Sequence, residues 1–123
     1  MEKSILLHRN ADNKLIGILT DKILCCVSEP TEKSTTVYYK DLDCSSIKVN
    51  EKITDIQKHI NATRPSIIVH TSKTIVLPVD LIVTVNEVSG GVMNSKLTIA
   101  SEYFEIDEVH ESVTAIVSMI NAA

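Results

Sequence analysis

The sequence repeats itself, because its second half carries the residue pattern of its first half about 60 positions later. When residues 49–62 are placed over 109–122, seven of 14 positions are identical. The identical pairs are Val49/Val109, Glu51/Glu111, Thr54/Thr114, Ile56/Ile116, Ile60/Ile120, Asn61/Asn121 and Ala62/Ala122. Average amino-acid usage would give about one such identity by chance. The sequence therefore indicates a tandem duplication of a small unit. A unit of this size buries too little surface alone, so we expect the two copies to pack against each other.

The correspondence continues upstream, with small changes of offset. Residues 5–8 match 67–70 at an offset of 62, residues 16–23 match 75–82 at 59, and residues 37–39 match 97–99 at 60. Each change falls in a polar or glycine-rich segment, where turns tolerate insertions. This placement favours one ancestral fold that has gained and lost residues only in its turns.

Each unit is predicted to form five short strands followed by a helix. Strands are expected at about 4–9, 14–19, 22–28, 34–40 and 46–49, and again at 66–71, 73–77, 80–88, 95–100 and 103–107. The apolar spacing at 53, 56 and 60, repeated at 113, 116 and 120, predicts amphipathic helices over 51–60 and 110–120. Asn50 is the expected N-cap of the first helix, and His110 in its place predicts a poorer cap for the second.

These elements predict an α+β fold. Each repeat is expected to be a small antiparallel meander of four to five short strands closed by a C-terminal amphipathic helix, and the two repeats are expected to pack with pseudo-two-fold symmetry. The predicted boundaries are 1–62 for unit one, 63–65 for a linker and 66–123 for unit two, all within one compact body. The linker Thr63-Arg64-Pro65 follows from the proline, which pushes the residue before it out of helical geometry.

The composition supports a packed aliphatic core and disfavours a nucleic-acid surface. Hydrophobic residues make up 44% of the chain, with one Phe and no Trp, and Ile and Val are abundant. The net charge is −4, and the only arginines are Arg9 and Arg64. Proteins that bind nucleic acid usually gather Lys and Arg on one face, so we do not expect this chain to bind it.

No segment of the sequence predicts a membrane or secretory location. There is no apolar run of the ~18 residues that a bilayer span requires, and residues 1–8 lack a signal-peptide pattern. Three cysteines, an odd number, favour free thiols in a reducing compartment. The expected location is the cytoplasm, which for a phage-encoded chain is the host cytoplasm and then the virion.

Two sets of side chains are candidates for metal or redox sites. His8 and His70 occupy equivalent strand positions and could meet to bind a metal, but the preferred interpretation is two partly exposed strand ends that share an ancestor. Cys25, Cys26 and Cys44 lack metal-ligand spacing and are not repeated in unit two, so they are interpreted as buried small hydrophobic residues.

The remaining polar motifs are interpreted as structural. Asp21 and Asp80 are repeated, and each is expected to bond its own turn backbone rather than act as an acid or base. Ser89-Gly90-Gly91 is predicted to form a hairpin turn, and the acidic residues within 102–108 a solvated strand face. The sequence thus predicts no catalytic, cofactor-binding or metal-binding residue, and no enzyme.

The segment Leu77-Pro78-Val79-Asp80-Leu81-Ile82 is followed by Phe104-Glu105-Ile106 and then by Glu111-Ser112-Val113. This order resembles the small flagellar-operon regulatory proteins (FlbD-like) and similar short phage-encoded proteins. The resemblance covers about 55 residues of unit two. Unit one matches more weakly, because Leu19-Thr20-Asp21 lacks the proline and Glu51-Lys52-Ile53 lacks the serine. The resemblance implies a small non-catalytic accessory module.

The leading hypothesis is a non-enzymatic structural or interaction module, such as an auxiliary capsid or decoration protein of a phage virion. Its partners would be proteins, either further copies of itself or a larger assembly on which it docks. The alternative is a small regulatory protein that binds a protein partner, with DNA binding disfavoured by the acidic charge.

Overall fold

The two halves of the chain contain the same succession of elements. The computed structural model describes residues 3–88, 93–101, 106 and 108–123. The first half comprises β1 (Ser4–His8), β2 (Leu15–Leu19), the 3₁₀ turn η1 (Thr20–Lys22), β3 (Ile23–Ser28), β4 (Thr35–Lys40), β5 (Cys44–Val49) and helix α1 (Ile53–Asn61). The second comprises β6 (Ser66–His70), β7 (Thr74–Pro78), η2 (Val79–Leu81), β8 (Ile82–Glu87), β9 (Ser95–Ile99), β10 (Glu108–Val109) and α2 (Val113–Ala122).

The chain is β-rich, as predicted, and every strand pair among the described residues is antiparallel. The sheet composition differs from the two self-contained meanders that the sequence predicted. One five-stranded sheet has the order β5-β4-β3-β7-β6 and therefore takes strands from both halves, while β10-β9-β8 and β1-β2 form smaller sheets. The β3–β7 pair joins the halves, with Cys26 opposite Val76, Val27 opposite Ile75 and Ser28 opposite Thr74.

The composition of β3 and β7 explains their central place. Residues 23–26 of β3 are all buried, and so are residues 75–78 of β7. A strand that is apolar on both faces must be covered on both faces, and one small unit cannot provide both covers. Pairing β3 with β7 lets each half cover one face of the other, so Val76 belongs to the core of the first half and Cys25 to the core of the second.

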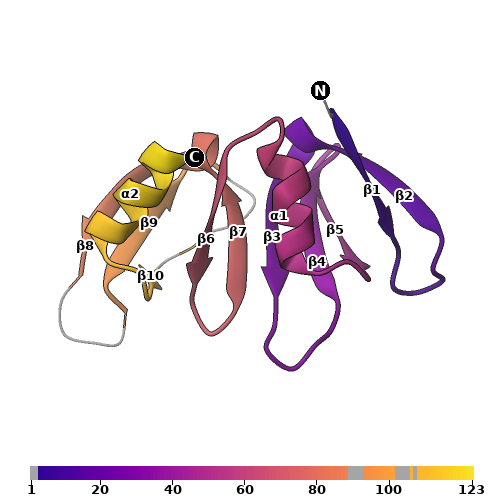
Figure 1. The fold of residues 1–123 in the computed structure, drawn as a ribbon, viewed down its shortest axis with the longest axis horizontal. Helices are drawn as coiled ribbons and strands as arrows, with labels where there is room; N and C mark the ends of the chain where they lie inside the picture. The colour runs from indigo at the N-terminus through magenta and orange to yellow at the C-terminus, as the bar shows by residue number, and fades with distance from the viewer. Residues whose placement is uncertain (1–2, 89–92, 102–105, 107) are drawn as a thin grey trace.

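The three sheets are linked at two further places. An isolated bridge joins Arg9 to Val49, and the N–H of Asn50 donates to the carbonyl of His8 at 2.9 Å. In the second half the N–H of His110 donates to the carbonyl of His70 at 2.8 Å. The strands therefore follow one another as β2-β1-β5-β4-β3-β7-β6-β10-β9-β8, and β2 and β8 end the series. Figure 1 shows these two strands at opposite ends of the long axis.

Both helices lie where the apolar spacing placed them, but their first turns differ from the prediction. Lys52 occupies the N-cap position of α1 and makes no side-chain capping bond, so the predicted Asn50 cap is wrong. The side chain of Asn50 instead binds Asn10 and Asn13. Helix α2 is the better capped of the two, since Ser112 Oγ accepts from the N–H of Ala115 at 3.1 Å. The expectation of a poorer second cap is therefore also wrong.

Two predicted features lie outside the described residues. The Ser89-Gly90-Gly91 turn is one, and most of the strand expected at 103–107 is the other; the described strand nearby is β10. Within the described ranges, neither helix has the length and apolar content of a membrane span.

Candidate interaction site

The β1–β2 hairpin carries leucines on a face that no described residue covers. Its register places Leu6 opposite Gly17, with Leu15 and Leu19 on the same face, while Ile5, Leu7 and Ile18 point into the core. Leu6, Leu15 and Leu19 are 64%, 56% and 51% exposed. A hairpin with apolar side chains on both faces and cover on only one is an unusual surface, because soluble proteins normally make the outer face polar.

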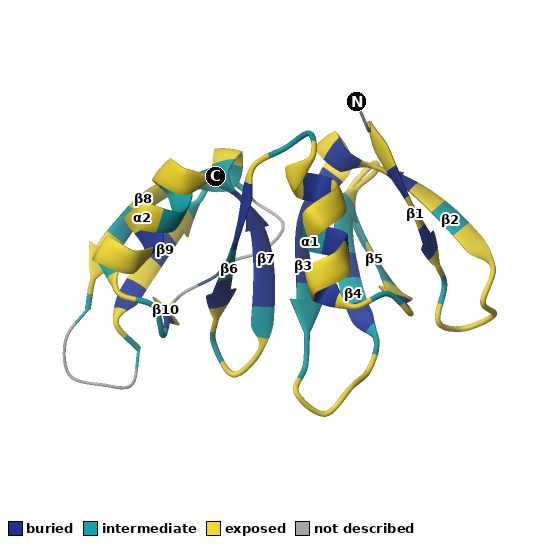
Figure 2. Ribbon diagram, in the orientation of Figure 1, coloured by how far each residue is buried: buried dark blue, intermediate teal, exposed yellow. Residues whose placement is uncertain are grey.

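The corresponding hairpin of the second half, β6–β7, has the same alternation but is covered on both faces. Ile68 and Val76 of its outer face pack in the core of the first half, and Val76 has no exposed surface. Val76 is the position that matches Gly17, and a Cβ placed on Gly17 would have no atom within 4 Å. The face that β7 buries is therefore exposed in β2, and Figure 2 shows β7 as mostly buried and β2 as mostly exposed.

The strand β8 ends the series on the other side. Among the strands that the structure describes it pairs only with β9, and its residue Val83 is 60% exposed. Thr84 and Asn86 are exposed on its outer face, whereas the matching residues of β3, Cys25 and Val27, pack in the core of the second half. Both strands carry an irregularity after their first residue, between Ile23 and Cys25 in β3 and between Ile82 and Thr84 in β8.

Two basic residues, Arg64 and Lys73, join the two halves beside the β3–β7 junction. The guanidinium of Arg64 donates from Nη1 to the carbonyls of Thr20 and Ile23, at 2.9 and 2.7 Å, and from Nε and Nη2 to the carboxylate of Asp80. Its side chain is only 13% exposed. The second pair joins Lys73 Nζ to Glu29 at 3.0 Å. Asp80 was expected to bond its own turn, and here it accepts from the linker arginine instead.

A hollow of about 420 Å³ lies beside this clamp, and its lining includes Asp21, Lys40 and Arg64. Arginine would be the natural anion-binding group there. Its Nη1 already donates to two carbonyls, and its Nε and Nη2 already bind Asp80. The hollow is therefore better explained as the outer surface of the clamp than as a ligand site.

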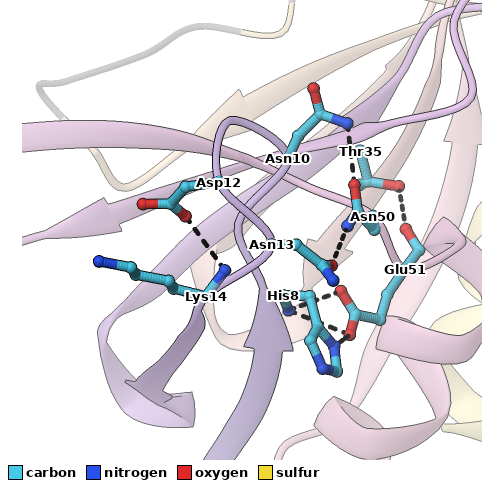
Figure 3. A network of polar contacts seen from close by, with 8 residues as sticks. All are labelled: His8, Asn10, Asp12, Asn13, Lys14, Thr35, Asn50 and Glu51. Carbon is cyan, nitrogen blue, oxygen red and sulfur yellow. Dashed lines mark hydrogen bonds and ion pairs between the residues drawn. The ribbon is translucent and has the colours of Figure 1, made fainter.

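The two predicted histidines each bind a glutamate of their own half. Glu51 accepts from the backbone N–H of His8 at 2.9 Å, and its other oxygen lies 2.8 Å from His8 Nδ1 (Figure 3). Glu111 makes the same two contacts with His70, at 2.7 and 2.6 Å. The structure therefore keeps the histidines in separate His–Glu pairs, each joining the first strand of a half to the start of its helix.

Neighbouring bonds strengthen each His–Glu pair. The hydroxyl of Thr35 donates to the carbonyl of Glu51 at 2.8 Å, and that of Ser95 to the carbonyl of Glu111 at 2.6 Å. In the first half the Asn50 amide also bridges Asn10 and Asn13 of the β1–β2 turn (Figure 3).

The glutamates carry the clearest electrostatic signature of these pairs. Burial alone would raise the pKa of Glu51, but the hydrogen bonds from His8 outweigh it and hold that pKa below the usual value. The pKa of Glu111 is lowered in the same way by His70. A carboxylate that orients a histidine also occurs in catalytic and metal sites. Such a site needs further groups, and the described residues hold no cluster of three or more metal-ligating side chains.

The cysteines are free and structural in character. Cys25 and Cys26 are buried, as predicted, while Cys44 is half-buried. Burial raises the pKa of Cys25 to about 12 and raises that of Cys26 further still. Buried thiols of this kind stay protonated and do not act as nucleophiles.

Sequence reasoning missed the partners of two residues that it had named. Glu51 and Glu111 were among the repeated identities, and so were the strand positions of His8 and His70. Both members of each His–Glu pair were therefore repeated in the sequence. The histidines matched at an offset of 62 and the glutamates at an offset of 60, so nothing connected the two. The position of Arg64 in the linker was predicted, but its contacts with Thr20, Ile23 and Asp80 were not.

Most of the contacts described above join one strand to another or one half to the other. Among the described residues, the outer edges of β2 and β8 have no strand paired with them. Comparison of the chain with family models, curated proteins and solved structures gave no match.

Proposed function

We propose that this protein is a non-enzymatic structural module that works by joining other protein chains through its strand edges. The observation that carries this proposal is the pair of end strands, β2 and β8, each with one edge unpaired among the described residues. The exposed leucines beside β2 add apolar surface at one of them. Open edges with apolar neighbours pair readily with further strands unless the protein protects them.

We further infer that the module is a tandem duplicate. The bounds of the matching elements differ by 62 residues for β1 and β6, by 59 for β2 and β7 and for β3 and β8, and the helices begin 60 residues apart. The His–Glu pair and the Thr/Ser bond to the glutamate carbonyl also occur once in each half. Both sets of matches support duplication of a complete folding unit.

A virion component, such as an auxiliary capsid or decoration protein, is the setting we propose for this module. The test is to purify particles from the native source and quantify this chain in them by mass spectrometry. A fixed number of copies per particle would support the proposal. A chain that is absent from particles and sediments as a monomer at every concentration would overturn it.

A small regulatory protein that binds a protein partner is the second candidate. The resemblance around Leu77–Ile82 to flagellar-operon regulators favours it, and the acidic charge directs it toward protein rather than DNA. A gel shift at low salt tests the DNA variant, for which we expect no complex. A genomic position among flagellar genes rather than capsid genes would favour this candidate over the first.

A further inference from the structure

We propose that copies of this chain assemble head to tail, with β8 of one copy pairing antiparallel with β2 of the next. This inference rests on the proposed function and on the duplication, and it names the partner as a second copy. Its pattern is already present inside the chain, where β3 of the first half pairs with β7 of the second. The strand β8 holds the place of β3 in its half, and β2 holds the place of β7.

The internal junction shows what such a contact buries. The outer face of β6–β7 enters the core beneath α1 through Ile68 and Val76. In return, Cys25 and Val27 of β3 enter the core beneath α2. The junction thus completes both cores at once, and a half that lacks its neighbour is left with incomplete cover.

The register of the second junction follows from the first. Ser28 opposite Thr74 becomes Glu87 opposite Leu15 of the next copy, because both positions shift by 59 residues. Likewise, Cys26 opposite Val76 becomes Val85 opposite Gly17. The bare Gly17 backbone then leaves room beneath α2 for the neighbouring Leu6 and its flanking leucines.

The half-buried apolar residues of helix α2 are those that this junction would cover. In α1 the inward residues Ile53, Ile56 and Ile60 are all buried. In α2 the matching Val113 and Ile120 are only half-buried, and Ile116 alone is fully covered. Helix α2 therefore resembles α1 with the incoming hairpin removed, and Leu6, Leu15 and Leu19 supply apolar side chains of the required kind.

Charge and placement also agree with head-to-tail pairing. Lys73 pairs with Glu29 across the internal junction, and the residue that matches Lys73 is Lys14. In the proposed register Glu29 is matched by Val88, and Lys14 lies one position along the strand from the pair of Leu15 with Glu87 of the preceding copy. The two edges lie at opposite ends of the molecule (Figure 1), so that one copy can bind a neighbour at each end. Such a heterologous contact closes into a ring or continues as a filament.

The test is sedimentation velocity over a wide range of concentrations, with one variant at each edge. Gly17→Lys places a charge where the internal junction has the fully buried Val76, and the Cβ that it adds would have no atom within 4 Å in the isolated chain. Thr84→Lys does the same at the position of Cys25. An unpaired charge buried in the junction should weaken self-association by at least about a hundred-fold. Leu42→Lys, at an almost fully exposed turn residue, is the matched control.

We expect the unmodified chain and Leu42→Lys to form assemblies that grow with concentration, and each edge variant to remain a monomer with an unchanged circular dichroism spectrum. An equimolar mixture of the two edge variants should form a complex of two chains and nothing larger, because one intact β8 edge and one intact β2 edge remain. Assembly that is indifferent to both variants would overturn the head-to-tail junction while leaving the proposed function standing. An unmodified chain that stays monomeric up to the highest concentration would overturn the junction outright.

Cross-linking provides a second measurement that does not depend on loss of assembly. In a Cys44→Ser background, Leu15→Cys and Glu87→Cys chains are mixed and oxidised. Directly opposed residues of an antiparallel pair lie about 4.5–5.5 Å apart, within disulfide reach. The expected product joins one chain of each kind. Disulfides only between two Leu15→Cys chains would indicate a symmetric contact and contradict the proposal.

Discussion

At the scale of single residues, the His–Glu pairs make stability depend on acid pH. Glu51 is held ionised by His8, so its pKa in the folded chain is below the ordinary 4.5. Between those two values the unfolded chain binds more protons than the folded one, and stability therefore rises with pH there. The contribution is fully present above the ordinary value and is lost as the pH falls through the folded value.

We expect Glu51→Gln to lower the free energy of unfolding at neutral pH by about 1–3 kcal/mol, because hydrogen bonds to the carboxylate are lost. The difference from the unmodified chain should shrink as the pH falls below 4.5. Urea unfolding followed by circular dichroism at several pH values measures both effects. Glu32→Gln is the control, since Glu32 is exposed and its contacts with Lys48 are long, at 3.4 Å. An equal loss in both variants would contradict the role assigned to the His–Glu pair.

The three thiols should differ in reactivity, because they differ in burial. Cys44 is half-buried, whereas Cys25 and Cys26 are buried, with pKa values raised far above neutral pH. We expect an alkylating reagent at neutral pH to label Cys44 first, and the other two only after denaturation. Mass spectrometry of the labelled native protein measures this order. Rapid labelling of Cys25 would mean that the β3–β7 junction opens readily.

At the scale of the elements, the two helices should respond differently to the same truncation. Ile60 of α1 has no exposed surface, whereas Ile120 of α2 is half-buried. Ile60→Ala should therefore cost about 2–5 kcal/mol, as core truncations do, and Ile120→Ala clearly less. Urea unfolding at a concentration where the chain is monomeric tests this contrast. Equal losses would mean that α2 is as well covered as α1.

The elements themselves were largely predictable, because their signal is local. Among the described residues, alternation predicted β1 to β9 to within a few residues, whereas β10 begins just beyond the strand expected at 103–107. The spacing of Ile53, Ile56 and Ile60 predicted α1. The helix start was wrong because Asn50 binds the distant turn residues Asn10 and Asn13, and no local pattern indicates that preference. The β3–β7 pairing was missed for a similar reason, because the alternation of apolar residues along a strand does not say which strand lies next to it. The uninterrupted apolar run of β3 was the available signal that it is covered on both faces.

At the scale of the whole molecule, the shared sheet and shared cores predict that the two halves unfold together. Val76 completes the first core, Cys25 completes the second, and Arg64 binds groups of both halves. Calorimetry should therefore show one transition whose van't Hoff and calorimetric enthalpies agree. Two separate transitions would contradict this coupling.

Arg64→Met should lower the midpoint of that single transition, because the carbonyls of Thr20 and Ile23 and the carboxylate of Asp80 would lose their donor. We expect a cost of about 1–3 kcal/mol. Arg9→Met, which removes the exposed pair with Asp12, is the matched control and should change stability little.

The few residues between Asn61 and Ser66 link the two halves that meet at the β3–β7 junction. This linker sets the local concentration of one half around the other. A short linker gives partners an effective concentration in the millimolar range. The same contact between separate chains has no such advantage, so it can remain open in dilute solution while the internal one stays closed. Each chain would then act as a permanently linked pair of subunits, and the concentration of the chain would decide when such pairs associate.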